Sequence, residues 1–544
     1  MKWLTAPLLA LLAKAAFAQL PADFESKVDD VCKEWNKPNA PGGVVGVAVD
    51  GKLVLAKGYG LANIEAGMKN TADTVMDVGS VSKQFTAMCI LLLEEEGKLS
   101  TSDDINKYLP EIPTFGQVVT IDHLMHMTSG LRDYLNIWVV EGYNFSDLRT
   151  PQQALETMVR QTGANSVPGA KWNYCNSGYM LLAEIVQRVS GKSLAVYAKS
   201  HIFDPLKMEQ SHFETDESEV VPGRATSYAP TFPGKFAGLS STLGVYGDGG
   251  VLTTLADLTK WHENFYNNKL GKGDSKLIDK MLQVGKLNGG QPTNYACGLT
   301  LDKSAGQDRV QHGGNWLGFN AMTARFPKKH VSIFTLGNDG TNLSSQFNTK
   351  IAELIFGTEK RSEPPVLTVS DDVLKRYPGT YLLPDGRAAE VTFEPGQLSI
   401  QLTGQQKFPI FPESETLFFL KVVQAKFEFK VDTGNKVTGA AIHQGGAQTE
   451  LTLGKPYTVA KEDMEAFVGH YKGIDVPIDV DITLNGERLE VRQKGEVQPI
   501  KLVGKDRAML ATFAIVAVRD ASGVVRAILV NTGRADGLKF LKSS

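Results

Sequence analysis

Residues 78–87, Val78-Gly79-Ser80-Val81-Ser82-Lys83-Gln84-Phe85-Thr86-Ala87, place a hydroxyl and an amine three positions apart where a helix is expected to begin. The apolar run that follows predicts a buried helix, and Gly97 is placed to end it. Positions i and i+3 lie on one face of a helix, so Ser80 and Lys83 are expected to point to the same spot.

This spacing suits nucleophilic catalysis. A serine alcohol is a poor nucleophile at neutral pH and needs a neighbouring group to take its proton. A lysine amine can take that proton when burial among apolar residues favours its neutral form. Ser-x-x-Lys also recurs by chance, in which case Ser80 is a helix cap and Lys83 a solvated cation, so the prediction depends on further motifs.

Length and charge limit the protein's class. A chain of 544 residues is expected to form two or three domains. The formal net charge of −3 offers no basic surface for nucleic acid. After residue 20 no run of about eighteen apolar residues predicts a membrane span.

The first eighteen residues differ in composition from the rest of the chain. Lys2 precedes the apolar run 4–13, and Ala16-Phe17-Ala18 is a small-x-small cleavage pattern. Residues 1–18 therefore predict a secretory signal peptide, and the protein is expected to be extracellular, or periplasmic in a bacterial source. The alternative is a buried N-terminal helix.

Cysteines and sequons add two expectations. The four cysteines are too sparse for a disulfide framework and lack metal-ligand spacing, and three pairings stay open for Cys32, Cys89, Cys175 and Cys297. Within the apolar helix, Cys89 is expected to be a buried free thiol. Asn144 and Asn342 begin glycosylation acceptor tripeptides, which matter only in a eukaryotic source.

The order of elements predicts the fold class. Residues 44–57 indicate a β-hairpin with an Asp50-Gly51 turn, and residues 80–190 are mainly helical in pattern. Strands return late, at 309–312, 322–326 and 331–336, followed by a helix over 344–356. Strands at both ends with helices between them predict an α+β domain with one antiparallel sheet built from distant parts of the chain.

The pattern changes at 361–365, where a Pro-Pro pair marks the expected domain boundary. Beyond it short alternating strands repeat: 377–381 is echoed by 467–471, and the turns at Asp432 and Asp520 recur at nearly the same offset. The tail therefore predicts two copies of a small β-barrel-like unit. The expected domains are 19–360, 366–456 and 461–544.

Two further motifs accompany Ser80. Tyr174 and Asn176 stand two apart in an expected loop before an apolar helix, where a phenolate near an ammonium can relay a proton. His312-Gly313-Gly314-Asn315 lies at the end of an expected strand. Glycines there permit close approach of a ligand to the backbone.

In order and spacing these motifs resemble the serine β-lactamase and penicillin-binding-protein superfamily, in the branch with class C β-lactamases, esterases and D-aminopeptidases (peptidase family S12-like). The likeness spans about residues 25–356 and includes 74–80, 124–131, 167–169, 204–208 and 249–254. It implies a β-lactamase/transpeptidase-like fold, an antiparallel sheet with a helical subdomain. The tail resembles two lipocalin-like barrel domains found in some D-aminopeptidase relatives.

The resemblance also implies roles for individual residues. Ser80 would be the acylated nucleophile, and Lys83 and Tyr174 would share the proton transfers. Asn176 would position Lys83 or the substrate amide. The backbone amides of Ser80 and Asn315 would form the oxyanion hole.

The third motif departs from the family pattern Lys-Thr/Ser-Gly. Here it reads His312-Gly313-Gly314, which offers a mostly neutral imidazole and no hydroxyl. We therefore expect weaker binding of a β-lactam or of a peptide with a free carboxylate. The variant resembles the esterase and aminopeptidase branches.

The leading hypothesis is a secreted serine hydrolase acting on a small-molecule or peptide ester or amide. The alternative is a secreted matrix or binding protein that keeps the fold without catalysis. His123 and His126 have the spacing of helical metal ligands but no convincing third ligand, so a structural role is expected. No metal or cofactor is implied, and no pattern specifies an oligomeric state.

Overall fold

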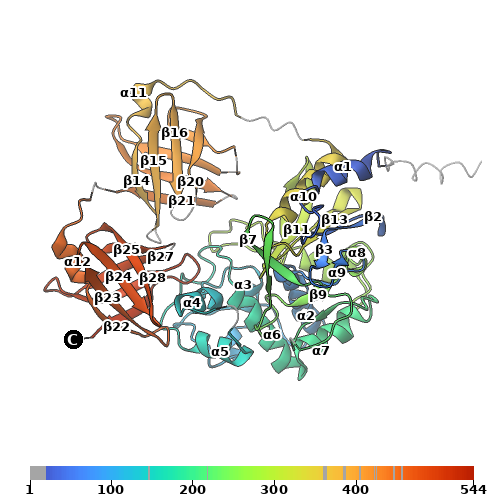
Figure 1. Cartoon of the computed structure of the whole chain (residues 1–544). Helices are drawn as coiled ribbons and strands as arrows, with labels where there is room; N and C mark the ends of the chain where they lie inside the picture. The colour runs from blue at the N-terminus through green and yellow to red at the C-terminus, as the bar shows by residue number, and fades with distance from the viewer. Residues whose placement is uncertain are drawn as a thin grey trace, which may run out of the picture.

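The computed structural model describes residues 20–144, 147–216, 218–358, 364–383, 387–402, 406–421, 423, 425–444, 447–454, 457–511 and 513–543. The expected signal peptide lies outside these residues. An α+β domain is followed by two closed eight-stranded barrels (Figure 1). This confirms the predicted fold class.

The α+β domain is built on a six-stranded antiparallel sheet. The predicted hairpin is present, and Asp50 and Gly51 both have positive φ, 48° and 72°, as a tight two-residue turn requires. One hairpin strand pairs with a strand nearly three hundred positions later, Gly43 with Gly337. The order is β10 (Thr300–Ser304), β11 (Gln307–Trp316), β12 (Phe319–Phe326), β13 (Val331–Gly337), β1 (Gly43–Val49) and β2 (Lys52–Tyr59).

The organising helix is α2 (Lys83–Glu95), whose first eleven residues are buried. A helix that is apolar on every side is stable only inside a core. The chain enters it through a 3-10 turn, η1 (Gly79–Ser82), and Ser80 makes no capping hydrogen bond, so the capping interpretation is wrong. Side chains three apart eclipse one another in a 3-10 turn, which stacks Ser80 on Lys83.

Both faces of the sheet are covered. Trp35 and Phe347 pack edge to face on one side, where α1 (Phe24–Val31) and α10 (Leu343–Phe356) lie (Figure 1). The large core around α2 fills the other side. Its further helices are α3 (Ile121–Met125), α4 (Tyr134–Val140), α5 (Pro151–Val159), α6 (Asn176–Ser190), α7 (Leu194–Ala198), α8 (Leu255–Glu263) and α9 (Ser275–Met281).

Small strands and turns complete the α+β domain. The short strand β9 joins two others in a three-stranded sheet, and two hairpin-like pairs lie apart from it. These are β5 (Met76–Asp77), β9 (Val251–Thr253) and β6 (His212–Phe213), then β3 (Leu61–Asn63) with β4 (Met68–Lys69), and β7 (Ser227–Phe232) with β8 (Lys235–Leu239). The remaining turns are η2 (Ile105–Lys107), η3 (Lys199–Phe203) and η4 (Pro327–Lys329).

The first barrel follows the short helix α11 (Asp371–Leu374). Its core is drawn entirely from its own residues, with Tyr377 and Phe429 stacked at 4.0 Å between ring centroids. Its strands are β14 (Gly379–Leu382), β15 (Ala388–Glu394), β16 (Gln397–Leu402), β17 (Phe408–Pro412), β18 (Leu417–Phe419), β19 (Ala425–Val431), β20 (Val437–Gln444) and β21 (Ala447–Leu453).

The second barrel repeats this design after α12 (Lys461–Phe467). Tyr471 donates to the Phe467 carbonyl at 2.8 Å, and Tyr381 donates to the Tyr377 carbonyl at 2.7 Å in the first barrel. Its strands are β22 (Gly469–Gly473), β23 (Asp479–Asn485), β24 (Arg488–Gln493), β25 (Glu496–Gly504), β26 (Arg507–Leu510), β27 (Phe513–Arg519), β28 (Val525–Asn531) and β29 (Leu538–Lys542).

The second barrel lies beside α4 and shares its core with the α+β domain (Figure 1). Ile137 and Val140 of α4 belong to the same buried cluster as Phe540 and the other inward side chains of the barrel. The four cysteines are all buried free thiols. Among the described residues, no helix has the length and apolar character needed to cross a bilayer.

Candidate active site

Ser80 and Lys83 meet at the start of α2. Lys83 Nζ lies 3.0 Å from Ser80 Oγ, 2.9 Å from Asn176 Oδ1 and 2.5 Å from the Asp248 carbonyl oxygen. The lysine side chain is fully buried. Three acceptors satisfy the three donors of an ammonium, and loss of one proton would let the Ser80 hydroxyl donate to the amine instead.

Asn176 is held by the start of its own helix. It begins α6, whereas a loop was predicted at this position. Its backbone N–H donates to Asp133 Oδ2 at 2.5 Å, and Asp133 Oδ1 accepts from the Asn136 N–H at 3.1 Å. Burial raises the pKa of Asp133. One carboxylate thus joins the N-termini of α4 and α6, and the amide of Asn176 points at Lys83.

Tyr174 completes the group around the amine. Its ring centroid lies 5.0 Å from Lys83 Nζ. Trp172 lies 6.4 Å from it between centroids, and this indole is 41% exposed at the edge of the group. The first two motifs therefore converge on Ser80, although nearly a hundred residues separate them.

These side chains line a cleft of about 730 Å³. All the residues predicted for catalysis and substrate binding except Lys83, which is enclosed behind Ser80, contribute to its wall. The lining includes Ser80, Tyr174, Asn176, Glu214, Asp248, His312, Gly313, Gly314, Asn315, Trp316, Asn342 and Arg534. A cleft of this size suits a small-molecule substrate.

His312 holds a fixed, neutral tautomer. Nδ1 lies 2.6 Å from the Gly313 carbonyl and must donate to it, so Nε2 accepts from the Tyr295 hydroxyl at 3.0 Å. Burial, and then the charge of Lys83, lowers the pKa of His312 to about 4. His312 therefore supplies no cation to the cleft at neutral pH.

The glycines of the first and third motifs bring two backbones together. A Cβ on Gly314 would collide with the Val78 carbonyl and lie 2.9 Å from the Ser80 nitrogen. A Cβ on Gly79, which has φ +51°, would lie 2.8 Å from the Asn315 nitrogen. The main chains of η1 and β11 thus touch beside the hydroxyl, where paired amides can stabilise an oxyanion.

Two buried carboxyl groups lie deeper in the cleft. Burial raises the pKa of Asp77 to about 7 and the pKa of Asp248 to about 6. Asp77 accepts from the Gly79 N–H at 2.6 Å, which supports the turn that carries Ser80. Asp248 accepts from the Tyr134 hydroxyl at 3.1 Å.

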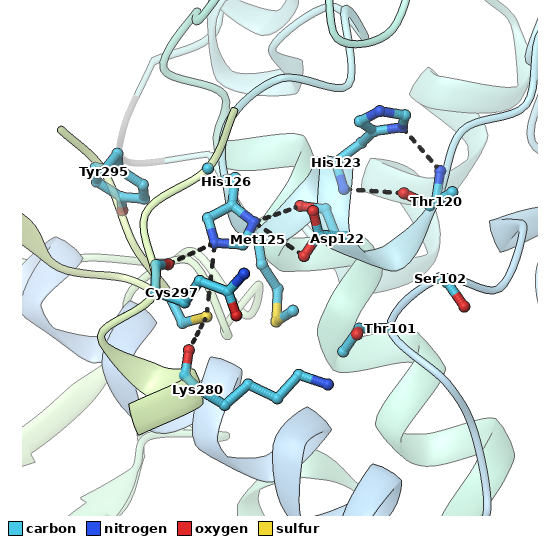
Figure 2. Close-up of polar contacts among 12 residues, drawn as sticks. Thr101, Ser102, Thr120, Asp122, His123, Met125, His126, Lys280, Tyr295 and Cys297 are labelled. Atoms are coloured by element: carbon cyan, nitrogen blue, oxygen red, sulfur yellow. Dashed lines mark hydrogen bonds and ion pairs between the residues drawn. The ribbon is translucent and has the colours of Figure 1, made fainter. Parts of the chain in front are cut away.

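The histidine pair that suggested a metal is built into the scaffold (Figure 2). His126 Nδ1 lies 3.1 Å from Asp122 Oδ1, and its Nε2 lies 3.0 Å from the Gln283 carbonyl. Both nitrogens face oxygen acceptors, so His126 is an imidazolium. His123 Nδ1 accepts from a backbone N–H at 3.2 Å. Among the described residues, no group of three or more His, Cys, Asp or Glu side chains could hold a metal ion.

Three residues of the site escaped prediction. Asp248 contributes its carbonyl to Lys83, and the glycines around it were the available signal. Tyr295 fixes His312 but has no local motif. Arg534 comes from the second barrel, and no pattern in the chain connects that barrel to the cleft.

Known proteins share this arrangement. Residues 15–355 match the Beta-lactamase family model, and residues 363–455 match a domain of unknown function, DUF3471. Penicillin-binding protein 4* of Bacillus subtilis (strain 168) is 30% identical over 436 residues, covering 76% of this chain and 95% of that protein. A D-aminopeptidase of Brucella melitensis biotype 1 is 24% identical, covering 92% of this chain and 95% of the relative.

A solved structure shares the fold. The octameric penicillin-binding protein homologue from Pyrococcus abyssi aligns with a TM-score of 0.56 at 24% identity, covering 87% of this chain and 98% of that one. With a family model matched over more than half of its length, the chain belongs to the Beta-lactamase family and is a serine hydrolase.

Proposed function

We propose that this hydrolase forms an acyl-enzyme at Ser80 and cleaves an ester or an amide. The observation that carries the proposal is the 3.0 Å contact between Ser80 Oγ and Lys83 Nζ at the wall of the cleft. A buried amine at this distance can take the hydroxyl proton as the oxygen attacks. Two carbonyl-type acceptors hold the amine in place.

The reaction follows from the surrounding groups. Neutral Lys83 takes the Ser80 proton while Oγ attacks the substrate carbonyl carbon. The oxyanion is stabilised by the amides of Ser80 and Asn315, and one such donor is worth about 3 kcal/mol. The leaving alcohol or amine receives the proton through Lys83 and Tyr174. Water then attacks the acyl-enzyme, the Ser80 hydroxyl is restored and the acid departs.

Within this class we favour an esterase or a D-amino-acid-directed amidase over a β-lactamase. The neutral His312 and the bare Gly313 replace the cation and hydroxyl of the family's usual third motif. The D-aminopeptidase relative, which aligns over nearly its whole length, supports the amidase branch.

Labelling with a neutral fluorophosphonate, followed by peptide mapping, tests the nucleophile. We expect the label at Ser80 and a loss of turnover on the order of a millionfold in Ser80→Ala. Lys83→Arg is the matched variant, since it keeps a cation that cannot act as a base at neutral pH. Folded protein that is labelled at another residue, or not labelled, would contradict the proposal.

We also propose that the protein is exported. The charged, apolar and small segments of residues 1–18 support a leader cleaved near Ala18. The exposed side chains of Asn144 and Asn342 are compatible with glycans in a eukaryotic source. Mass spectrometry of protein recovered from the medium should find Gln19 at its N-terminus, whereas retained Met1 would contradict cleavage.

A further inference from the structure

A loop of the second barrel forms part of the cleft wall. It spans 532–537, between β28 and β29, and Arg534 lines the cleft together with Ser80. The Arg534 guanidinium carbon lies 5.0 Å from the centroid of the Tyr174 ring. We infer that Arg534 binds an anionic group of the substrate, so that the second barrel selects carboxylate-bearing esters or amides. This inference rests on the proposed acyl-enzyme at Ser80.

The backbone of the loop is fixed to the α+β domain. The Arg534 carbonyl accepts from the Asp133 N–H at 2.9 Å and from Asn165 Nδ2 at 2.7 Å. The Asp536 N–H donates to Asn165 Oδ1 at 2.8 Å. Asp133 also positions Asn176, which accepts a hydrogen bond from the Lys83 amine. The Arg534 loop and Lys83 are therefore both held through Asp133.

A buried ion pair anchors the base of the loop. The Arg132 guanidinium donates to the carbonyls of Asp536 and Gly537 at 2.8 and 2.9 Å. It also lies 3.2 Å from Asp475 of the second barrel, and the two side chains are 5% and 0% exposed. Such a pair holds its partners firmly, because separating them leaves a buried charge without a counterion.

Arg534 is the available cation of the cleft. Lys83 is enclosed by three acceptors, and His312 is neutral. Among the described residues, the Arg534 guanidinium forms no ion pair, and its side chain is exposed. A planar guanidinium binds a carboxylate through two parallel hydrogen bonds.

The acidic groups that line the cleft are already engaged. Glu214 pairs with Arg224, with 3.0 Å between Nη2 and Oε2. Asp77 accepts a backbone N–H, and burial raises its pKa to about 7. Asp248 is likewise buried behind Lys83. The charge of Arg534 also acts on the nearby Asp133 carboxyl, which accepts the N–H groups of Asn176 and Asn136. The acids of the lining form no ion pair with Arg534, which lines the substrate space.

The inference changes one expectation from the sequence. The third motif lacks its usual lysine, which predicted weak binding of a free carboxylate. Arg534 returns a positive charge to the cleft from a different domain and on the side of Tyr174. The anionic group is therefore expected at the barrel loop, beside the Arg534 guanidinium and the Tyr174 ring.

Two esters of similar size test the inference: 4-nitrophenyl glutarate, which carries a terminal carboxylate, and neutral 4-nitrophenyl pentanoate. The readout is the ratio of their kcat/KM values, with active sites counted by fluorophosphonate labelling. We expect the wild type to favour the glutarate and Arg534→Ala to lower the ratio about 10- to 100-fold, mainly through KM, as for a charged hydrogen bond.

Three further variants complete the design. Arg534→Lys should keep part of the preference, and Arg534→Glu should reverse it in favour of the neutral ester. Arg526→Ala is the control, because Arg526 is an exposed barrel residue paired with Asp520 at 2.7 Å, and its ratio should match the wild type.

Each alternative outcome is decisive. A wild type without preference, or a ratio that Arg534→Ala leaves unaltered, would overturn the inference while labelling at Ser80 still supports the acyl-enzyme. Failure to label Ser80 in the folded wild type would overturn the proposed function itself, and the inference with it.

Discussion

The two barrels share a fold and differ in what they contact. The first buries a core made only of its own side chains. The second includes Ile137 and Val140 of the α+β domain in its core, and it sends a loop into the catalytic cleft. The two barrels are thus similar units, and only the loop of the second lines the cleft that holds Ser80 among the described residues. Contacts outside the barrel, rather than the barrel itself, distinguish their roles.

The largest effect is expected from the ion pair under the loop. Arg132→Ala leaves Asp475 buried without a counterion and should destabilise the docked unit by about 3–5 kcal/mol. The matched change in the first barrel is Lys426→Ala, which removes a half-exposed pair with Glu413 and should cost less than about 1 kcal/mol. Calorimetry measures the loss of stability in both variants. Equal losses would contradict the view that only the second barrel is anchored by a buried ion pair.

The shared core gives the next effect. Ile137→Ala removes a fully buried side chain from the second-barrel cluster and should cost about 2–5 kcal/mol. Ile410→Ala does the same within the first barrel. Only the Ile137 variant should also lower the glutarate-to-pentanoate ratio, because only that core supports the Arg534 loop. A change of ratio in both variants would show that the first barrel also acts on the cleft.

A pH titration separates the α+β domain from the first barrel. Burial favours neutral His126, but the Asp122 carboxylate and Cys297 outweigh it and raise the pKa of His126 to about 11 from 6.5. A raised pKa stabilises the fold fully below pH 6.5, and this stabilisation is lost as the pH rises towards 11.

The loss should reach about 1.4 kcal/mol per pH unit at most. It should appear in the calorimetric transition of the α+β domain, with the first-barrel transition as an internal reference. His126→Gln should remove the slope. If the variant and the wild type lose stability in parallel with rising pH, the imidazolium assignment is wrong.

The smallest effect tests what the barrels have in common. Tyr381→Phe and Tyr471→Phe each remove one equivalent hydrogen bond to the carbonyl four residues earlier, and each should cost about 1 kcal/mol. If thermal unfolding gives similar losses of stability for the two variants, the barrels differ in what they contact and not in their internal packing. A much larger loss of stability in one barrel would show that the two barrels differ in their internal packing.

Much of the fold could be predicted from local sequence patterns. The Asp50-Gly51 turn, the apolar α2 segment and the echo of Tyr377–Tyr381 each act within a few residues, and each predicted its element. The spacing of Ser80 and Lys83 likewise predicted their contact. The start of α6 at Asn176 was missed because its support comes from a distant carboxylate, Asp133.

Long-range contributions could not be predicted. Tyr295 and Arg534 reach the cleft only because separate elements dock there, and neither residue stands in a motif. From the third motif alone we expected weaker binding of a peptide with a free carboxylate. The second barrel, which is held by the pair of Arg132 and Asp475, brings Arg534 to the cleft, and no local pattern indicates this contact.

The position of Arg534 in the chain has a consequence for biosynthesis. Ser80 and Lys83 emerge from the ribosome more than four hundred residues before the Arg534 loop, which lines the same cleft as Ser80. A nascent chain can therefore fold its nucleophile and amine before it has any means of discriminating among acyl groups. On the role inferred for Arg534, selectivity is acquired last, when the second barrel packs against α4.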